Sequence, residues 1–392
     1  MFAIKSIRYR KILNSHVDFT LEYIIELDDG TIGMGSSPQG ETLSIYEDRS
    51  FFIEPQQIID VIKKDRYFHV PVNQIKFDEY LQQRVGNFGR NNAFALSLAF
   101  YNATMKKTPP GMTDEIKKAA FPHLCLNILN GGKYAYTNPV VSDFPEYLLV
   151  TKSNDITRII ECHNRIQCRI QEDFMKGRKI VVYGNPVNEF GVRDNRSCIE
   201  YLLNLLENLR LKNEFDLMID ASAGDLYNAE KYKFFITDAS LRSGDELCEY
   251  WIRLIEDYGI KYLEDPFEER DYENWNKLTT AQTMCFIIGD NFYSSDCDRI
   301  KQAANSRYTH GVIVKPNQAG TVTATIKAIQ AAQHEDQIVI TSHRSISTES
   351  TFLSAVTFAM NVKFIKIGPL LSDYSSIIRL NEMIRLTGGN DE

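Results

Sequence analysis

Short apolar runs alternate with longer amphipathic segments from about residue 122 to the end of the chain. The runs have the length and composition of buried strands, and the longer segments have the spacing of helices. The apolar runs are Ile180–Tyr183, Leu217–Asp220, Ile260–Leu263, Cys285–Gly289, Gly311–Val314, Gln337–Thr341 and Phe364–Ile365. The helices are predicted at Ser197–Leu211, Gly244–Tyr258 and Thr321–Gln333, and from near Thr348. Such alternation predicts a parallel sheet, and this many units favours a closed (β/α)8-type, TIM-like barrel.

The first part of the chain has a different pattern. Alternating apolar residues predict strands at Ile4–Tyr9 and Phe19–Leu27, and helical spacing predicts helices at Pro55–Lys64 and Asn91–Lys106. Strands followed by helices favour a small α+β domain, and 392 residues exceed what one hydrophobic core usually supports. We therefore predict an α/β protein with an N-terminal α+β capping domain, residues 1–125, and a C-terminal barrel, residues 126–392.

Charge and cysteine content exclude several classes of protein. The net charge is −8 and no basic stripe is present, which argues against nucleic-acid binding. The seven cysteines form no Cys-x-x-Cys pair, so reduced thiols in a cytoplasmic protein are expected rather than a disulfide framework or a zinc site. The N-terminus has no signal-peptide pattern, and no apolar run is long enough to cross a membrane.

Ionisable residues stand at or just past the ends of six successive predicted strands. They are Asp220, Glu264, Asp290, Lys315, His343 and Lys366. In a β/α barrel the carboxyl ends of the strands share one face, and that face carries the active site. The sequence therefore predicts that these six side chains meet at the mouth of the barrel.

The three acidic residues of this set, Asp220, Glu264 and Asp290, predict a magnesium site. Three converging carboxylates repel one another unless a positive charge lies between them, and Mg²⁺ is a hard cation that prefers oxygen ligands. The alternative is that each residue is a helix cap or a surface charge, since carboxylates favour helix N-termini. Their shared position at strand ends favours the metal.

The two lysines, Lys315 and Lys366, follow or end apolar runs and should point into the same mouth. A lysine partly removed from water beside other cations can act as a base, and a protonated one can bind a carboxylate. The alternative is a surface lysine with its ammonium group in solvent. Neither run is amphipathic in a way that would leave the lysine outside.

The motifs around these residues resemble the enolase family over nearly the whole second half of the chain. The matching segments are Asp220–Tyr227, Glu264–Phe267, Gly289–Asp290, Val314–Thr321, Ser342–Ser345 and Ile365–Pro369. Lys-x-Asn-Gln-x-Gly-Thr followed by Ser-His-Arg-Ser is a specific combination, and its order and spacing agree with the family. The first half is similar more weakly, at Gly89–Ala93 and Leu126–Gly132.

The resemblance implies a role for each matching position. It implies that Asp220, Glu264 and Asp290 hold a tightly bound Mg²⁺, and that a second Mg²⁺ binds with substrate. Lys315 matches the base that removes the proton next to the substrate carboxylate, and Lys366 the lysine that neutralises that carboxylate. The remaining matches are Arg344 and Ser345 to the phosphate contacts, His343 to a substrate-proximal histidine, and Glu189 to the acid that helps hydroxide leave. The resemblance also implies a homodimer and a small anionic phosphorylated or phosphono-carboxylate substrate.

The departures from the family pattern lie in the residues that handle substrate and leaving group. A second family acid, normally Glu, falls on Asp143, and a histidine of the family falls on Tyr134, which stays neutral near pH 7. In the loop Gly35–Gly40 the serine that contacts the second metal aligns with Pro38, and its neighbour Ser37 is the residue that could take its place. These differences bear on the substrate more than on the class of reaction.

Three functions remain open from the sequence. The first is magnesium-dependent dehydration of 2-phosphoglycerate to phosphoenolpyruvate. The second is a related lyase acting on a different phospho- or phosphono-carboxylate, similar to carboxyphosphonoenolpyruvate synthase, which Tyr134 and Asp143 favour. The third is a non-catalytic paralogue, which the retention of both lysines and all three carboxylates disfavours.

Overall fold

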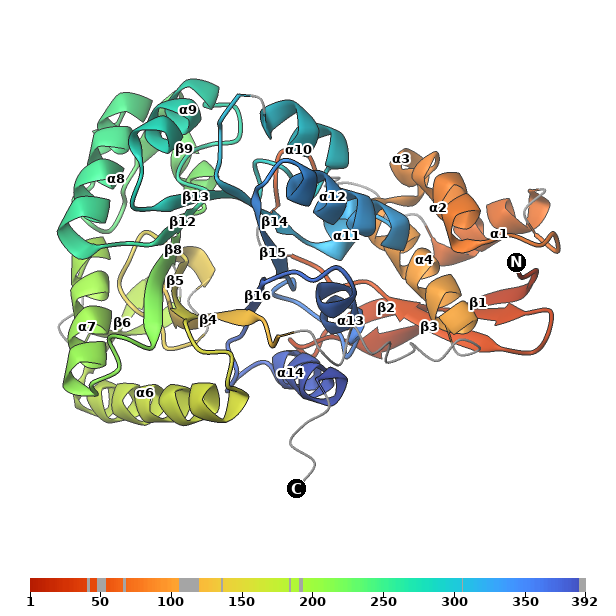
Figure 1. Cartoon of the computed structure of the whole chain (residues 1–392), viewed down its shortest axis with the longest axis horizontal. Helices are drawn as coiled ribbons and strands as arrows, with labels where there is room; N and C mark the ends of the chain where they lie inside the picture. The colour runs from red at the N-terminus through yellow and green to blue at the C-terminus, as the bar shows by residue number, and fades with distance from the viewer. Residues whose placement is uncertain are drawn as a thin grey trace.

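The structure is a computed structural model of the chain. It describes residues 1–40, 43–47, 54–65, 68–105, 120–134, 137–182, 185–189, 193–304 and 306–387. Figure 1 shows a small N-terminal domain beside a larger barrel whose outer side is covered by helices.

The N-terminal domain has one three-stranded antiparallel sheet packed against helices. Its strands pair in the order β1–β2–β3, and α4 lies across β2 and β3. Its elements are β1 (Ile4–Leu13), β2 (Phe19–Leu27), β3 (Ile32–Ser36), α1 (Pro55–Lys64), α2 (Gln74–Gln82), α3 (Val85–Phe88) and α4 (Arg90–Met105). Gly33 and Gly35 permit the close approach of β3, because a Cβ at either position would lie about 2 Å from backbone atoms of α4. This domain is the α+β unit that the sequence predicts.

The second domain is a closed barrel of eight strands. The strand order is β4–β5–β8–β12–β13–β14–β15–β16, and β16 pairs with β4. The strands are β4 (His123–Asn130), β5 (Glu146–Thr151), β8 (Phe215–Asp220), β12 (Tyr262–Glu264), β13 (Phe286–Gly289), β14 (Gly311–Val314), β15 (Ile338–Ser342) and β16 (Phe364–Ile367). The predicted fold class is confirmed. The predicted domain division after residue 125 falls within β4, and it stays a prediction.

Helices cover the outside of the barrel. They are α6 (Ile156–Lys176), α7 (Asn195–Asn208), α8 (Gly244–Tyr258), α9 (Tyr272–Ala281), α10 (Cys297–Ala304), α11 (Pro316–Ala319), α12 (Val322–His334), α13 (Phe352–Ala359) and α14 (Tyr374–Leu386). Capping residues set the bounds of α8. Ser243 and Glu246 form a capping box at its start, and Gly259 ends it with φ +65°. Short elements fill the connections: η1 (Gly132–Tyr134), η2 (Ala223–Leu226), β9 (Tyr227–Asn228), β10 (Lys231–Lys233) and β11 (Leu241–Arg242).

One barrel strand runs against the others. β5 pairs antiparallel with both β4 and β8, whereas the remaining neighbours are parallel. The mouth of the barrel therefore meets β5 at its first residue, Glu146, which is the ladder partner of Asp220 at the end of β8. A purely parallel barrel was expected from the alternation, and this strand departs from that expectation.

The run Ile180–Tyr183 is not a barrel strand, which corrects the prediction. It forms most of β6 (Arg178–Val182), which pairs only with β7 (Asn185–Glu189) in a two-stranded antiparallel hairpin within the described residues. Tyr183 lies outside the described residues. Val181 is largely exposed, so an apolar run here does not mean burial in the sheet.

The two domains are joined by hydrogen bonds at the end of β14. Arg90 donates to the carbonyl of Gln318 at 2.6 Å, and Asn317 donates to the side chain of Asn91 at 3.0 Å. The carboxylate of Asp78 accepts the backbone N–H of Thr323 at 2.8 Å. These contacts hold α2 and α4 of the N-terminal domain against the segment that follows β14.

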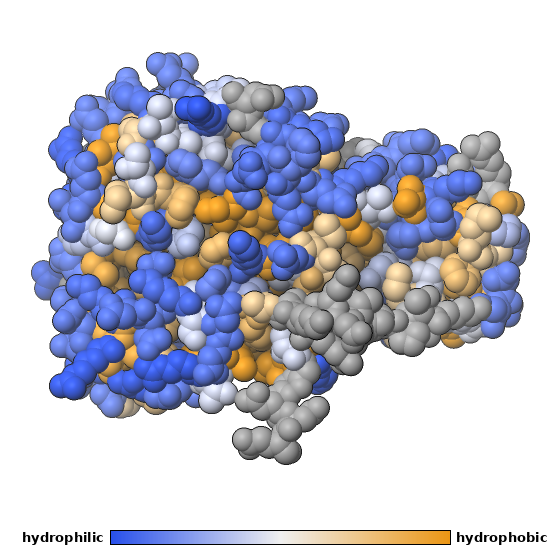
Figure 2. All heavy atoms as spheres, in the orientation of Figure 1, coloured by the Kyte–Doolittle hydropathy of each residue, from blue (hydrophilic) through white to orange (hydrophobic). Residues whose placement is uncertain are grey.

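The interior of the barrel and the layer between strands and helices form the main cores. Eight buried residues fill the barrel interior: Cys125, Leu148, Val150, Met218, Tyr262, Ile288, Ile313 and Ile340. Outside it, α6 buries Ile159, Cys162 and Ile166 at helical spacing and presents polar residues outward. Figure 2 shows this polar covering over most of the visible face, with apolar residues in between. None of the helices within the described residues has the length and apolar character needed to cross a bilayer.

Candidate active site

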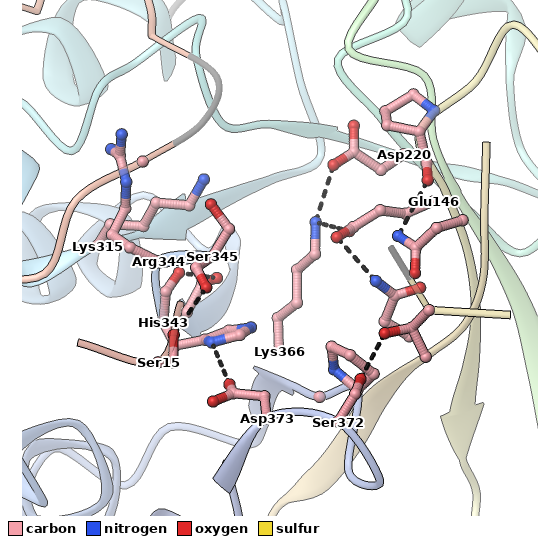
Figure 3. A pocket seen from close by; sticks show the side chains of 18 of the residues that line it. Ser15, Glu146, Asp220, Lys315, His343, Arg344, Ser345, Lys366, Ser372 and Asp373 are labelled. Atoms are coloured by element: carbon pink, nitrogen blue, oxygen red, sulfur yellow. Dashed lines mark hydrogen bonds and ion pairs between the residues drawn. The ribbon is translucent and has the colours of Figure 1, made fainter. Parts of the chain in front are cut away.

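The six ionisable residues predicted at strand ends all lie at the mouth of the barrel. Asp220 and Glu264 end β8 and β12, Lys366 lies in β16, and the other three follow directly after β13, β14 and β15. A cavity of about 420 Å³ opens there, and five of the six line it. The sixth, Glu264, has no exposed side-chain surface and contacts the ammonium group of Lys366, a residue that Figure 3 shows in the cavity.

Lys366 is the centre of a buried cluster of opposite charges. Its ammonium nitrogen lies 2.7 Å from Glu264 Oε2 and 2.9 Å from Asp220 Oδ2. It also lies 2.7 Å from Oε2 of Glu146, a residue that the sequence did not point to. Burial alone would lower the pKa of Lys366, but the surrounding carboxylates raise it well above its usual value. Lys366 is therefore an ammonium group held by three carboxylates.

The acidic partners of Lys366 differ in their pKa. Burial, together with the charge of Asp220, raises the pKa of Glu264 well above its usual value. Burial also opposes ionisation of Asp220, but the charge of Lys366 outweighs it and lowers the pKa of that carboxyl. One ammonium group shared among several carboxylates leaves the most deeply buried of them the hardest to ionise.

Lys315 and Asp290 form the second ion pair of the mouth. The ammonium group of Lys315 donates a short hydrogen bond to Asp290 Oδ2, and both side chains are almost fully buried. Asp290 Oδ1 is buried and has no hydrogen-bond partner among the described residues. The loop that carries Asp290 is held by Asp265, whose carboxylate accepts the backbone N–H groups of Asp290 and Asn291 at 2.9 and 2.8 Å.

The donor set of Asp220, Glu264 and Asp290 fits a hard divalent cation. The three carboxylates stand on the neighbouring strands β8, β12 and β13, they are buried, and Asp290 offers an oxygen without a partner. Within the described residues, no three His, Cys, Asp or Glu side chains surround one point in this conformation. The ammonium group of Lys366 lies between Asp220 and Glu264 instead.

Arg344 and Ser345 line the cavity on the side of the N-terminal domain. The guanidinium group of Arg344 donates to Glu47 Oε2 at 3.0 Å, and both side chains are buried. Burial opposes ionisation of Glu47, but the charge of Arg344 outweighs it and lowers the pKa of Glu47. Gly40 lies against the same guanidinium group. A larger residue there would displace that group, since a Cβ at this position would lie 1.6 Å from Arg344 Nη2.

His343 is a neutral ring at the edge of the cavity. Burial, with the nearby charge of Arg379, lowers the pKa of His343 to about 3. Its Nδ1 lies 3.7 Å from Asp373 Oδ2, which is too long for a hydrogen bond. Since the ring is neutral near pH 7, this contact is not an ion pair.

Two predicted residues lie away from the cavity. Both oxygens of Asp143 accept backbone N–H groups, from Ile236 at 2.8 Å and from Thr237 at 3.0 Å, and Asp143 does not line the cavity. Ser37 is also buried away from it, and its hydroxyl donates to the carbonyl of Pro38 at 3.3 Å. Asp143 therefore holds the loop before β11 in this structure.

The side chains of two other predicted residues lie outside the described part of the chain. Tyr134 is the last residue of η1 and Glu189 the last of β7, and only their backbone is described. Their predicted contacts with substrate stay predictions.

The sequence missed Glu146 and Glu47. Glu146 precedes an apolar run instead of following one, because β5 is antiparallel, and a rule based on carboxyl ends of strands passes over it. A glutamate directly before a run of buried residues was the available signal. Glu47 comes from the other domain, and nothing in the local pattern points to it.

Comparisons with known proteins agree with this architecture. Residues 118–389 match the family described as "Enolase, C-terminal TIM barrel domain". The enolase of Ehrlichia ruminantium (strain Welgevonden) is 28% identical over an alignment 419 positions long, which covers 97% of this chain and 96% of that enolase. The enolase of Sulfolobus acidocaldarius is 25% identical over an alignment 393 positions long, which covers 94% of this chain and 91% of that protein. The similarity thus extends over both domains.

Proposed function

Because the chain belongs to the enolase family, we propose that it catalyses the magnesium-dependent dehydration of 2-phosphoglycerate to phosphoenolpyruvate. The observation that carries the proposal is the set of charged groups around one cavity. Lys315, Lys366 and Arg344 supply three positive charges at the walls of a space of about 420 Å³. A small substrate with a carboxylate and a phosphate matches these charges.

The reaction assigns a separate task to each lysine. Lys315 Nζ removes the proton from the carbon next to the substrate carboxylate, and Lys366 stays protonated and stabilises the charge that develops on that carboxylate. The electron pair from the broken C–H bond is first held on the substrate carboxylate as an enolate. It then forms the new C=C bond as the neighbouring C–O bond breaks. The hydroxyl takes up a proton from Glu189, the residue that the family resemblance assigns to this step, and leaves as water. Glu189 then regains a proton from solvent, and Lys315 returns its proton to solvent.

Asp220, Glu264 and Asp290 are the residues that would hold Mg²⁺. When bound there, the ion supplies positive charge next to the substrate carboxylate as that group gains electron density. The pairing of Lys366 with Asp220 and Glu264 supports this assignment, since these carboxylates already accept a cation between them.

Arg344 is the residue that we assign to the phosphate. Its planar guanidinium group can bind two phosphate oxygens, and Ser345 beside it can donate a hydroxyl hydrogen bond. Glu47 accepts a hydrogen bond from one of the guanidinium N–H groups. A phosphate bound to Arg344 would share this contact or displace it.

A second candidate function is the same class of reaction on a different phospho- or phosphono-carboxylate. Two observations favour it. Both oxygens of Asp143 accept backbone N–H groups and Asp143 does not line the cavity, and the wall near β4 is lined by polar groups, Asn127 and Asn130 among them. A substrate with further polar substituents would suit such a wall. From the family we also infer a homodimer in the cytoplasm.

The test is the absorbance of phosphoenolpyruvate formed from 2-phosphoglycerate and Mg²⁺ by the purified protein. Lys315→Ala should reduce the rate at least about 100-fold, because the base is removed. Lys301→Ala, at an exposed position of α10, is the matched control and should leave the rate unchanged. Product that forms equally well with Lys315→Ala would refute the proposed mechanism. No product with the unmodified protein would direct the search to other phospho- and phosphono-acids.

A further inference from the structure

We propose that Glu146 is the residue that binds the leaving hydroxyl of the substrate and holds it on the side of the cavity opposite Lys315. The inference rests on the proposed function. It adds to the site a substrate contact at a position outside the matched family motifs.

The first support is the position of the two residues in the ring of strands. Lys315 directly follows β14, and Glu146 begins β5, and these strands are four steps apart in either direction round the eight-stranded barrel. Strands four steps apart in such a ring face each other across it. Figure 3 shows Lys315 and Glu146 on opposite sides of the cavity, with Lys366 between them.

This placement suits an elimination in which proton and hydroxyl leave from opposite faces of the substrate. A substrate whose carboxylate contacts Lys366 would present its C–H bond to Lys315 and its hydroxyl to the wall formed by β4 and β5. A carboxylate at that wall accepts the O–H of the hydroxyl and fixes its direction.

The second support is exposure. About 24% of the side-chain surface of Glu146 is exposed, compared with 9% for Asp220, 4% for Asp290 and none for Glu264. Among these four side chains that of Glu146 is the most exposed, and it lines the cavity although its Oε2 is buried. It is therefore the one best placed to contact a bound substrate.

The third support is the way in which Glu146 is held. Oε1 accepts a hydrogen bond from Asn127 Nδ2 at 3.0 Å, and Oε2 pairs with Lys366. Asn127 lies on β4, on the side of β5 away from β12 and β13. The hydrogen bond from Asn127 holds one oxygen at the β4 wall, and Lys366 holds the other beside Asp220 and Glu264.

Glu189 is proposed above as the proton donor to the hydroxyl, so the residue that competes with Glu146 for the hydrogen bond from that hydroxyl is Asp143, three positions earlier in the chain. Its two oxygens are taken up by the backbone of Ile236 and Thr237, and it is 5% exposed. To contact substrate it would have to release both hydrogen bonds. Both oxygens of Glu146 also have partners, Asn127 and Lys366, but these partners and Glu146 itself all line the cavity, whereas Asp143 does not.

The experiment separates removal of the proton from loss of the hydroxyl. In D₂O, Lys315 returns deuterium to substrate that has not reacted further, and mass spectrometry of the substrate measures this exchange, while absorbance measures elimination. We expect Glu146→Gln to keep exchange within a few-fold of the unmodified protein and to lower elimination about 100-fold. Lys315→Ala should lose both.

One control and one competing variant make the result specific. Glu249→Gln, on the exposed side of α8, is the control and should keep the ratio of elimination to exchange of the unmodified protein. Asp143→Asn tests the competing residue, and its ratio of elimination to exchange should be well above that of Glu146→Gln. A selective loss of elimination in Asp143→Asn with normal elimination in Glu146→Gln would overturn the inference and return the role to Asp143. An equal fall of both rates in Glu146→Gln would also overturn it, because Glu146 would then act through Lys366.

Metal binding gives an independent readout. Glu146→Gln should retain the rise in unfolding temperature that Mg²⁺ causes, whereas Asp290→Asn should lose it. Loss of this rise in Glu146→Gln would make Glu146 a metal ligand and refute its assignment to the substrate. Absence of both exchange and elimination in the unmodified protein would refute the proposed function, and the inference with it.

Discussion

The ammonium nitrogen of Lys366 lies 2.7 Å from Oε2 of Glu264, a carboxylate with no exposed side-chain surface. Neither group could be buried alone as an ion without a large loss of stability. In this conformation the burial of each charged group therefore depends on the presence of the other. The pair also shows that the acidic cluster of the mouth accepts positive charge at its centre.

We expect Mg²⁺ to raise the unfolding temperature of the protein. An ion at about 100 times its Kd stabilises the folded state by about 2.7 kcal/mol, provided that it binds only that state. Differential scanning fluorimetry with added MgCl₂ or with EDTA measures the shift. Asp290→Asn should abolish it, and Asp298→Asn, at an exposed position of α10, should not. A shift of equal size in Asp290→Asn would contradict the assignment of the metal ligands.

We expect Glu47→Gln to bind inorganic phosphate more tightly. The change removes the negative charge next to Arg344, and it should lower the Kd about three- to tenfold, as judged from the strength of a screened ion pair. Isothermal titration calorimetry measures this affinity. Glu47→Asp keeps the charge and is the matched control. Unchanged or weaker binding by Glu47→Gln would mean that Glu47 orients Arg344 rather than competing with the anion.

We expect His343 to make the protein less stable in acid. Burial lowers its pKa from 6.5 to about 3, so between these values the unfolded chain binds a proton that the folded chain does not. Stability therefore falls as the pH is lowered through this window, by up to about 1.4 kcal/mol per pH unit from this group. The difference in unfolding free energy between the unmodified protein and His343→Asn, measured in urea from pH 7 to pH 4, isolates the histidine from the nearby carboxylates. A difference that does not change with pH would contradict the prediction.

We expect Asp143→Ala to destabilise the fold. The change leaves the N–H groups of Ile236 and Thr237 without their acceptor, which should cost about 2 kcal/mol or more. Urea unfolding measures the loss. Asp257→Ala removes an exposed ion pair with Arg196 and should cost less than about 1 kcal/mol. Full stability in Asp143→Ala would show that this loop does not need the carboxylate.

Much of the site could be predicted because one rule of barrel geometry applies to most of its residues. Asp220, Lys315 and Lys366 stand at or near the carboxyl ends of parallel strands, and such ends meet at one face whatever the details of packing. The motifs around them pointed to the enolase family, and the comparisons confirm that membership. Local patterns also predicted helices such as α1 and α8 with their observed bounds, since their ends carry proline, a capping box or glycine.

The sequence by itself determined the fold class, because apolar periodicity and strand-end residues depend only on local order along the chain. The tertiary structure decided which carboxylates face the cavity. Asp143 and Glu146 are near neighbours in sequence, yet one binds the backbone of a distant loop and the other pairs with Lys366 from another strand. The antiparallel direction of β5 and the contact of Glu47 with Arg344 join residues far apart in the chain. Such contacts arise from packing between elements, and no local pattern contains them.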